Sequence, residues 1–172
     1  PVIFRQKRYG LDNRLFEVYK FRSMRFEPAA QAGEIRLTEH GDSRVTVIGN
    51  FLRRTSLDEF PQFLNVLQGH MSVVGPRPHP PGVKAGGRTY EDVVDDFMER
   101  YKVRPGITGW AQVNGRNAIS WEEKFEYDVW YVENMSFLLD IRILFLTIKK
   151  VLIREGINSD TSATMEAFKG NL

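Results

Sequence analysis

The chain has 172 residues, enough for one domain with an apolar core, and 42% of them are hydrophobic while 27% are charged. This balance excludes an intrinsically disordered or low-complexity chain. The absence of cysteine excludes disulfide frameworks, thiolate zinc sites and cysteine nucleophiles, and three scattered histidines argue against a zinc enzyme, so any metal would be held by oxygen atoms.

The net charge of +2 is unevenly distributed along the chain. Residues 1–25 carry seven basic and two acidic side chains, so positive charge is concentrated at the start. Such a block suits an anionic partner, which can be the phosphates of a small molecule, nucleic acid or lipid headgroups. Solvated side chains on an exposed hairpin explain the same pattern equally well.

The first predicted element is a β-hairpin. Two runs with apolar residues among basic ones are separated by residues 10–14, Gly-Leu-Asp-Asn-Arg, which are typical of a turn. Residues 26–46 contain two glycines and a proline but few large apolar side chains, which predicts a surface excursion with a short helical stretch near 29–31.

The middle of the chain alternates between helical and loop signals. Residues 48–52 and 57–67 carry apolar side chains at mixed helical spacing. Residues 73–87 contain four prolines and four glycines, so we predict a loop. Residues 90–103 favour a helix, because acidic residues come early and the basic residues Arg100 and Lys102 come late, as the helix dipole prefers.

Two more helices are predicted at residues 121–134 and 137–153. The second is the most apolar part of the chain, but it is shorter and more charged than the ~20 apolar residues that a membrane-spanning helix needs. Two interpretations remain open for it. It can be a core helix, or a helix that lies in the lipid interface with its lysines toward the headgroups.

A first candidate site lies in residues 53–61, Arg-Arg-Thr-Ser-Leu-Asp-Glu-Phe-Pro. The serine and Glu59 have the spacing of a capping box, so both residues could simply cap a helix. Pro61 would then fall inside that helix, where it predicts a kink or a fresh start. At such a break Asp58 and Glu59, with Arg53 close in sequence, would attract a phosphate and offer the nucleophile or magnesium ligand of phosphoryl transfer.

Further candidates suit anionic ligands. In Gly75-Pro76-Arg77-Pro78 the two prolines fix the backbone and give the Arg77 guanidinium a preset direction, toward a phosphate, a base edge or a carboxylate. Residues 103–116 combine glycines with Arg116, so their backbone can approach a ligand, although two tight turns explain the pattern as well. Asp128 lies in a predicted helix, where an exposed carboxylate is the plain alternative.

Taken together and in order, four motifs resemble the bacterial sugar transferase family, the monotopic phosphoglycosyl transferases that start lipid-linked glycan assembly. The motifs are residues 19–24, 56–61, 75–78 and 104–116, and the resemblance runs from about residue 1 to about residue 157. It implies transfer of a sugar 1-phosphate from a UDP-sugar to polyprenol phosphate, with release of UMP. The product would start an exopolysaccharide, an O-antigen or a glycoprotein glycan.

The resemblance also implies roles for individual residues. Asp58 matches the family's nucleophile and Glu59 a magnesium ligand, and the implied cofactor is Mg²⁺ at this Asp-Glu dyad. The Pro-Arg-Pro segment matches the element that contacts the nucleotide, through Pro76, Arg77 and Pro78. The remaining substrate-binding candidates are charged residues near the phosphates or the active site: Lys20, Arg53, Arg116 and Asp128.

The implied fold is α+β, a mainly helical membrane-associated domain with an N-terminal β-hairpin and long ordered loops. It would be one catalytic domain over residues 1–172, with the hairpin at 1–25, the catalytic core at 45–157 and a tail at 158–172. Members of the family carry a hydrophobic membrane segment before the globular part. This sequence contains no such segment, so we expect it to be the catalytic portion of a longer protein.

The family implies a location on the cytoplasmic face of a bacterial inner membrane. The lipid-facing candidates are Phe60, Phe63, Leu64 and the helix at 137–153. The partners would be a UDP-sugar, polyprenol phosphate and the lipid surface, without nucleic acid, and a homodimer is compatible with the sequence. The identity of the sugar is not readable from these residues.

Two rival functions remain open. A nucleic-acid binding module would use Phe4, Tyr9, Phe16 and Phe21 as stacking platforms within the basic block, and would be indifferent to Asp58. A non-catalytic scaffold would keep the fold while another chain performs catalysis. A nucleotide-sugar hydrolase would differ from the transferase only in using water as the acceptor.

Overall fold

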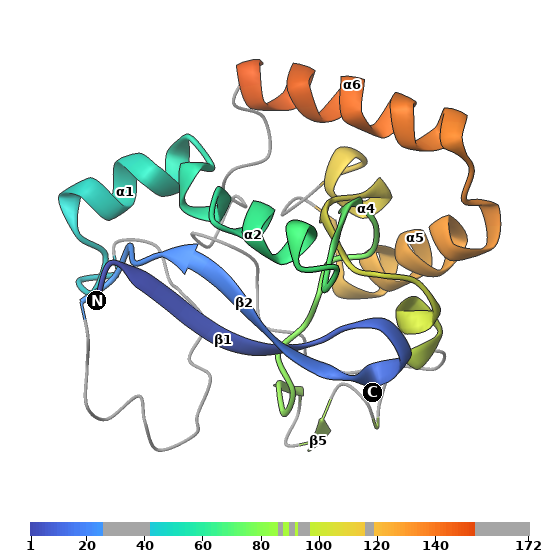
Figure 1. The fold of residues 1–172 in the computed structure, drawn as a ribbon, viewed down its shortest axis with the longest axis horizontal. Helices are drawn as coiled ribbons and strands as arrows, with labels where there is room; N and C mark the ends of the chain where they lie inside the picture. Colours follow the sequence, from blue (N-terminus) through green and yellow to red (C-terminus); the bar gives the residue numbers. More distant parts are fainter. Residues whose placement is uncertain (26–41, 86–87, 90–91, 93–96, 116–118, 154–172) are drawn as a thin grey trace.

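The computed structural model describes residues 1–25, 42–85, 88–89, 92, 97–115 and 119–153. This part of the chain is an α+β fold in which helices account for more residues than strands, as predicted (Figure 1). In chain order the elements, with η marking a 3-10 helix, are β1 (Ile3–Tyr9), η1 (Leu11–Asn13), β2 (Leu15–Phe21), α1 (Val47–Arg54), η3 (Leu57–Glu59), α2 (Gln62–Leu67), β3 (Ser72–Val74), β4 (Lys84–Ala85), β5 (Arg88–Thr89), η4 (Phe97–Lys102), β6 (Gly106–Thr108), α4 (Trp110–Val113), α5 (Trp121–Asn134) and α6 (Phe137–Ile153).

The predicted hairpin is confirmed. β1 and β2 pair antiparallel and η1 joins them. Asp12 and Asn13 have φ values of 53° and 61°, in the left-handed region that Asp and Asn tolerate better than most residues. The turn therefore closes the hairpin in a register that sets Lys20 opposite Phe4.

Three short helices, α1, η3 and α2, follow the hairpin in the described chain. The hydroxyl of Thr46 accepts a hydrogen bond from the Gly49 N–H at 2.9 Å and caps α1. A Cβ at Gly49 would lie 1.8 Å from the carbonyl oxygen of Ser23, so α1 packs directly on the chain that leaves β2. Pro61 stands immediately before α2, which confirms the predicted fresh start at this proline.

A short parallel sheet joins the middle of the chain to its second half. β3 pairs with β6, with Ser72 opposite Gly106 and Val74 opposite Thr108. A Cβ at Gly106 would lie 2.1 Å from the backbone nitrogen of Gly75, so only glycine allows the strands to approach this closely. The sheet ends where the Pro-Arg-Pro segment begins.

This sheet corrects the loop predictions. The predicted loop at residues 73–87 starts inside β3, and two of its residues form the short strand β4. Residues 103–116, for which two tight turns were an alternative, contain β6 and the helical turn α4. β3 and β6 pair with each other across more than 30 residues, which local sequence patterns do not report.

The two long helices have the predicted bounds. Ser120 and Glu123 form a capping box before α5. Within the helix predicted at 90–103, residues 97–102 form the 3-10 helix η4. The excursion predicted at 26–46 lies outside the described residues except for its end, and so do the helical stretch near 29–31 and the tail at 158–172.

Only part of α6 belongs to the core. Ile143 is fully buried, and Tyr131, Val74 and Val113 pack around it. The opposite face of α6 exposes large apolar side chains, and in Figure 1 this helix runs along the upper edge of the molecule, away from the hairpin. No described helix is long and apolar enough to cross a bilayer.

Candidate active site

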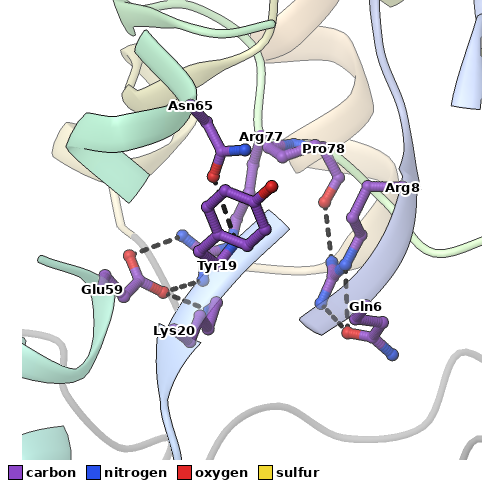
Figure 2. Close-up of polar contacts among 8 residues, drawn as sticks. All are labelled: Gln6, Arg8, Tyr19, Lys20, Glu59, Asn65, Arg77 and Pro78. Atoms are coloured by element: carbon purple, nitrogen blue, oxygen red, sulfur yellow. Dashed lines mark hydrogen bonds and ion pairs between the residues drawn. The ribbon is translucent and has the colours of Figure 1, made fainter. Parts of the chain in front are cut away.

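The carboxylate of Glu59 is the meeting point of three segments that are distant in sequence. Lys20 on β2 donates from Nζ to Oε1 of Glu59 at 2.7 Å. Arg77, from the loop after β3, donates from Nη2 to Oε1 at 2.5 Å and from Nη1 to Oε2 at 3.3 Å. Figure 2 shows both cations converging on this carboxylate. Glu59 therefore fixes the positions of two positive charges beside the loop.

The electrostatics of Glu59 follow from these contacts. Burial alone would raise the pKa of the Glu59 carboxyl, but the charges of Arg77 and Lys20 and their hydrogen bonds hold that pKa well below its ordinary value. The same interaction raises the pKa of Arg77. Glu59 is therefore an anion at neutral pH.

Asp58 has a different environment although it is the adjacent residue. Its side chain is half-buried and accepts no hydrogen bond from the part of the chain that the structure describes. Burial raises the pKa of the Asp58 carboxyl, the charge of Glu59 adds to this effect, and Lys20, Arg53 and Arg77 oppose it. Neighbouring carboxyls whose environments push their pKa values apart are typical of sites that assign them different chemical roles.

The local backbone explains why the two carboxyls diverge. Ser56 adopts φ 58° and ψ 14°, a left-handed turn that ends α1 and starts η3. The side chain of Ser56 makes no capping hydrogen bond to η3, and the Glu59 carboxylate contacts Lys20 and Arg77 instead. The capping-box interpretation of this serine and glutamate is therefore wrong.

The Pro-Arg-Pro loop is held mainly through its carbonyl groups. Gly106 N–H donates to the Pro76 oxygen at 2.9 Å, and Arg8 Nη1 donates to the Pro78 oxygen at 2.7 Å. Proline has no N–H, so a segment with two prolines has few donors of its own and is anchored chiefly where its oxygens are accepted. The sequence prediction that Arg77 has a preset direction is consistent with this anchoring, and the direction is toward a carboxylate.

The sequence profile described as "Bacterial sugar transferase" matches residues 1–154. The chain belongs to the bacterial sugar transferase family. This confirms the resemblance that the four motifs carried, and it makes the chain a transferase by family.

The chain aligns with different shares of the length of its individual relatives. It is 47% identical to the uncharacterized sugar transferase EpsL of Bacillus subtilis (strain 168), over 99% of this chain and 80% of that protein. It is 46% identical to the UDP-glucose:undecaprenyl-phosphate glucose-1-phosphate transferase of Escherichia coli (strain K12), over 91% of this chain. A third relative is the UDP-N-acetylgalactosamine-undecaprenyl-phosphate N-acetylgalactosaminephosphotransferase of Aeromonas hydrophila, at 43% identity over 91% of this chain. The chain spans about a third of the length of these last two proteins, 34% and 36%.

Among the remaining predicted site residues of the sugar transferase, the structure describes Arg53, Pro76 and Pro78. Arg53, on the last turn of α1, acts electrostatically on Asp58. Pro76 and Pro78 are buried in the loop that carries Arg77. Arg116 lies outside the described residues.

Asp128 is not an exposed helix carboxylate. Its side chain is 2% exposed, and its Oδ2 accepts from Arg100 Nε at 3.0 Å and Nη2 at 2.5 Å. Burial raises the pKa of the Asp128 carboxyl, and the Arg100 guanidinium opposes that effect. Asp128 therefore makes its contacts inside the protein. It binds Arg100, and Arg100 in turn contacts the backbone of Arg77.

Sequence reasoning missed Asn65, a residue that supports the site. Asn65 on α2 is fully buried, and its side chain accepts from Tyr19 N–H at 3.0 Å and donates to the Glu17 oxygen at 2.7 Å. It thus bonds to the free edge of β2 beside Lys20 (Figure 2). Nothing local marked this asparagine, because a polar residue in a short helix is ordinary.

The donor set suits a magnesium ion that shares its coordination with a substrate. No group of three or more His, Asp or Glu side chains with metal-binding geometry occurs among the described residues. Mg²⁺ does not require one, since it commonly uses one or two carboxylates together with substrate phosphates and water. Asp58 offers a carboxylate without a hydrogen-bond partner in the described chain, and the adjacent Glu59 offers a second one that already accepts from Lys20 and Arg77. These two residues fit Mg²⁺ only in combination with a phosphate ligand.

Proposed function

We propose that this sugar transferase moves a sugar 1-phosphate from a UDP-sugar to polyprenol phosphate, releasing UMP and forming a polyprenyl diphosphate sugar. The names of the relatives from E. coli and A. hydrophila describe sugar-phosphate transfer to undecaprenyl phosphate and support this reaction. One observation carries the proposal. Glu59 holds two cations in place while Asp58, beside it, has no hydrogen-bond partner in the described chain and can react.

The first half-reaction uses Asp58 as the nucleophile. Its carboxylate oxygen attacks the phosphorus that carries the sugar, and the bond from that phosphorus to the bridging oxygen of the diphosphate breaks. UMP leaves with the electron pair, and an acyl phosphate between Asp58 and the sugar phosphate remains.

The second half-reaction transfers the sugar phosphate to the lipid. An oxygen of polyprenol phosphate attacks the same phosphorus, and the Asp58 carboxylate leaves. This route avoids a direct encounter between two anionic substrates, which would repel each other. It predicts ping-pong kinetics.

The basic residues around the dyad would stabilise the charge on the transferring phosphate. Lys20 and Arg77 are oriented by Glu59, and Arg53 would add positive charge near Asp58. Arg116, which lies outside the described residues, is included on the family resemblance alone. Loss of one well-placed donor in such a site typically costs about 3 kcal/mol of barrier. The contact of Arg77 with Glu59 leaves 39% of the arginine side chain exposed, so it can also reach a nucleotide phosphate.

We include Mg²⁺ in the proposal as a cofactor bound by Asp58 and Glu59 together with the diphosphate. When bound, it would neutralise negative charge on the diphosphate and on the departing UMP. The fit of the two carboxylates supports this, and removal of Mg²⁺ by EDTA should abolish UMP release. Mn²⁺ bound in place of Mg²⁺ should broaden the NMR signals of bound UDP by its paramagnetism. This broadening would show that the metal and the diphosphate share one site, without requiring turnover.

We further propose that the enzyme lies on the cytoplasmic face of a bacterial inner membrane. Phe60, Phe63 and Leu64 are 60%, 44% and 52% exposed, and α6 exposes Phe145 at 70%. Monomeric soluble proteins rarely expose apolar patches of this kind. An interfacial position would bury these side chains in lipid and bring the dyad near the head of the polyprenol phosphate.

The sugar and the glycan are left open within this reaction. The relatives' names include glucose, N-acetylgalactosamine and galactose, so a panel of UDP-sugars is needed to decide. A relative from Rhizobium leguminosarum bv. phaseoli is named as an exopolysaccharide production protein, which supports an exopolysaccharide product. O-antigen and glycoprotein glycans remain alternatives.

The test measures UMP release by the protein in lipid nanodiscs from a panel of UDP-sugars. With a short polyprenol phosphate the reaction should turn over, and without it one equivalent of UMP should appear while the labelled sugar phosphate stays attached to Asp58. Asp58→Asn should abolish both signals. Full turnover in Asp58→Asn, or kinetics that require donor and acceptor to be bound together, would refute the covalent route.

The two rival functions fit the structure less well. The ring of Tyr9 packs on Tyr101 and the ring of Phe16 on His70, which leaves these aromatics engaged within the protein and not arranged to stack on bases. A non-catalytic scaffold would not need the Glu59 contacts. UMP release in the nanodisc assay separates the transferase from both rivals, since neither of them would release UMP.

A further inference from the structure

The strongest unexplained feature is a buried ion pair behind the Pro-Arg-Pro loop. Arg100 on η4 is 0% exposed and Asp128 on α5 is 2% exposed. The Arg100 guanidinium also lies over the ring of Phe125, 4.7 Å from its centroid. The pair is therefore fully enclosed, and no substrate can touch Asp128 without a rearrangement of the core.

Stability alone explains this pair poorly. Moving two charges out of water costs several kcal/mol per ion, and apolar residues of the same volume are often equally stable. The pair is also incompletely satisfied, because Arg100 Nη1 and Asp128 Oδ1 find no hydrogen-bond partner within the described chain. Retention of a costly buried pair is more readily explained if one of its groups performs a further task.

Arg100 has such a task at the Arg77 backbone. Its Nη2 donates to the carbonyl oxygen of Arg77 at 2.9 Å. The Nδ1 atom of His79 lies 3.1 Å from both the Arg100 Nη2 and the Arg77 oxygen. Asp128 fixes the guanidinium from behind, and the guanidinium fixes the residue whose side chain reaches Glu59.

The contact completes a series of four consecutive anchored carbonyls. Pro76 is held by Gly106 N–H, Arg77 by Arg100, Pro78 by Arg8 and His79 by Tyr9 N–H at 3.0 Å. The four donors come from three elements, Gly106 from β6, Arg100 from η4, and Arg8 and Tyr9 from β1, so three separate parts of the fold hold the loop. A long arginine side chain keeps one position only if both ends are fixed. The carbonyl anchors fix its start, and Glu59 fixes its end.

We propose that Asp128 is a positioning residue and not a substrate ligand: through Arg100 it holds the Arg77 backbone so that the Arg77 guanidinium stays on Glu59. This revises the role that the family resemblance suggested for Asp128, and it rests on the proposed function for its activity readout. Misplacement of a catalytic group by about 1 Å can cost on the order of 100-fold in rate. We therefore expect Asp128→Asn to lower kcat/KM for UMP release by roughly 10- to 100-fold.

The test is a double-mutant cycle, because an indirect role through Arg77 makes a specific prediction. In an Arg77→Ala background the added change Asp128→Asn should lower kcat/KM by less than about threefold, since the group that it positions is already gone. The loss of thermal stability caused by Asp128→Asn should be the same in both backgrounds. A purely structural role of the pair would instead give losses of activity that multiply.

A matched control on the same helix is Tyr131→Phe. This change removes a part-buried hydrogen bond from the Tyr131 hydroxyl to Asp140 at 2.7 Å, a contact that involves no residue of the Pro-Arg-Pro loop. It should destabilise the protein while leaving kcat/KM unchanged at a permissive temperature. If Tyr131→Phe lowers kcat/KM as much as Asp128→Asn at equal stability, the positioning role is refuted.

A second variant covers the case in which Asp128→Asn does not fold. Arg8→Gln removes the anchor on Pro78 from the hairpin side. As with Asp128→Asn, it should lower kcat/KM much less in the Arg77→Ala background than in the wild type. Failure of the proposed function is distinguishable, because then the wild type releases no UMP from any UDP-sugar. In that case a crystal structure of Asp128→Asn or Arg8→Gln decides, since an unchanged Arg77–Glu59 contact would overturn the inference and a displaced Arg77 would support it.

Discussion

Replacement of Asn65 by alanine tests whether the hairpin is attached to the catalytic helices through one side chain. Asn65 is fully buried, and it bonds both to the N–H of Tyr19 and to the carbonyl of Glu17 on β2. The residue that follows Tyr19 is Lys20, which contacts Glu59. Loss of Asn65 should therefore weaken both the fold and the site.

The magnitude follows from the groups that lose a partner. Asn65→Ala removes two part-buried hydrogen bonds, each contributing about 0.5–1.5 kcal/mol, so the free energy of unfolding should fall by about 1–3 kcal/mol. For a domain of this size, each 1 kcal/mol lowers Tm by roughly 2–4 °C. At a temperature where the variant is still folded, kcat should also fall, because Lys20 is held less firmly.

The assay is urea unfolding of Asn65→Ala beside Gln62→Ala, a matched control on the same helix. Gln62 is also buried, but its Nε2 finds no hydrogen-bond partner in the described chain. Truncation of Gln62 should therefore cost less than half as much. If the two variants lose equal stability and equal activity, Asn65 does not anchor the hairpin and the reasoning is refuted.

Three further variants test other parts of the structure. Burial and the charges of Arg100 and Arg8 hold the pKa of His79 well below its usual value, so the unfolded chain takes up a proton near pH 6.5 that the folded chain refuses. The free energy of unfolding should then fall by up to about 1.4 kcal/mol per unit as the pH drops from 6.5 to 5, and a slope that His79→Gln leaves unchanged in urea titrations would contradict this. Gly106→Ala should prevent folding, because its Cβ would meet the Gly75 nitrogen at 2.1 Å. Gly82→Ala has nothing within 4 Å of its Cβ and should cost only about 1–2 kcal/mol of backbone strain. Soluble yield and circular dichroism distinguish the two variants. Phe145→Ser should weaken binding to anionic vesicles by roughly 10- to 100-fold with little change in Tm, and equal weakening by Leu15→Ser, an exposed leucine on the hairpin, would argue against α6 as the lipid-facing helix.

The elements that the sequence predicted well have strong local signals. The hairpin has a turn sequence between two apolar runs, α5 has a capping box, and Pro61 interrupts a helix in the expected place. The sheet of β3 and β6 has no such signal, since its strands are three residues long and pair across more than 30 residues. Short non-local pairings are determined by packing, which local patterns do not encode.

The same distinction between local signals and tertiary contacts applies to the candidate site. Proline neighbours marked three of the site residues in the sequence. Asp58 and Glu59 are adjacent carboxylates before a proline that interrupts a helix, and Arg77 lies between two prolines. Which cation contacts which carboxylate is a tertiary fact, and the sequence did not assign Lys20 and Arg77 to Glu59.

Arg100 shows why the supporting residues escaped notice. Near the end of a predicted helix, Arg100 and Lys102 both look like cations that complement the helix dipole. Lys102 fits that description, since it is exposed and pairs with Glu99 one turn away. Arg100 is fully buried on Asp128, and it reaches the Arg77 backbone. A residue that fits its local pattern is not marked by the sequence as unusual. Residues that hold a reactive side chain in place are therefore hardest to predict when their own sequence context is ordinary.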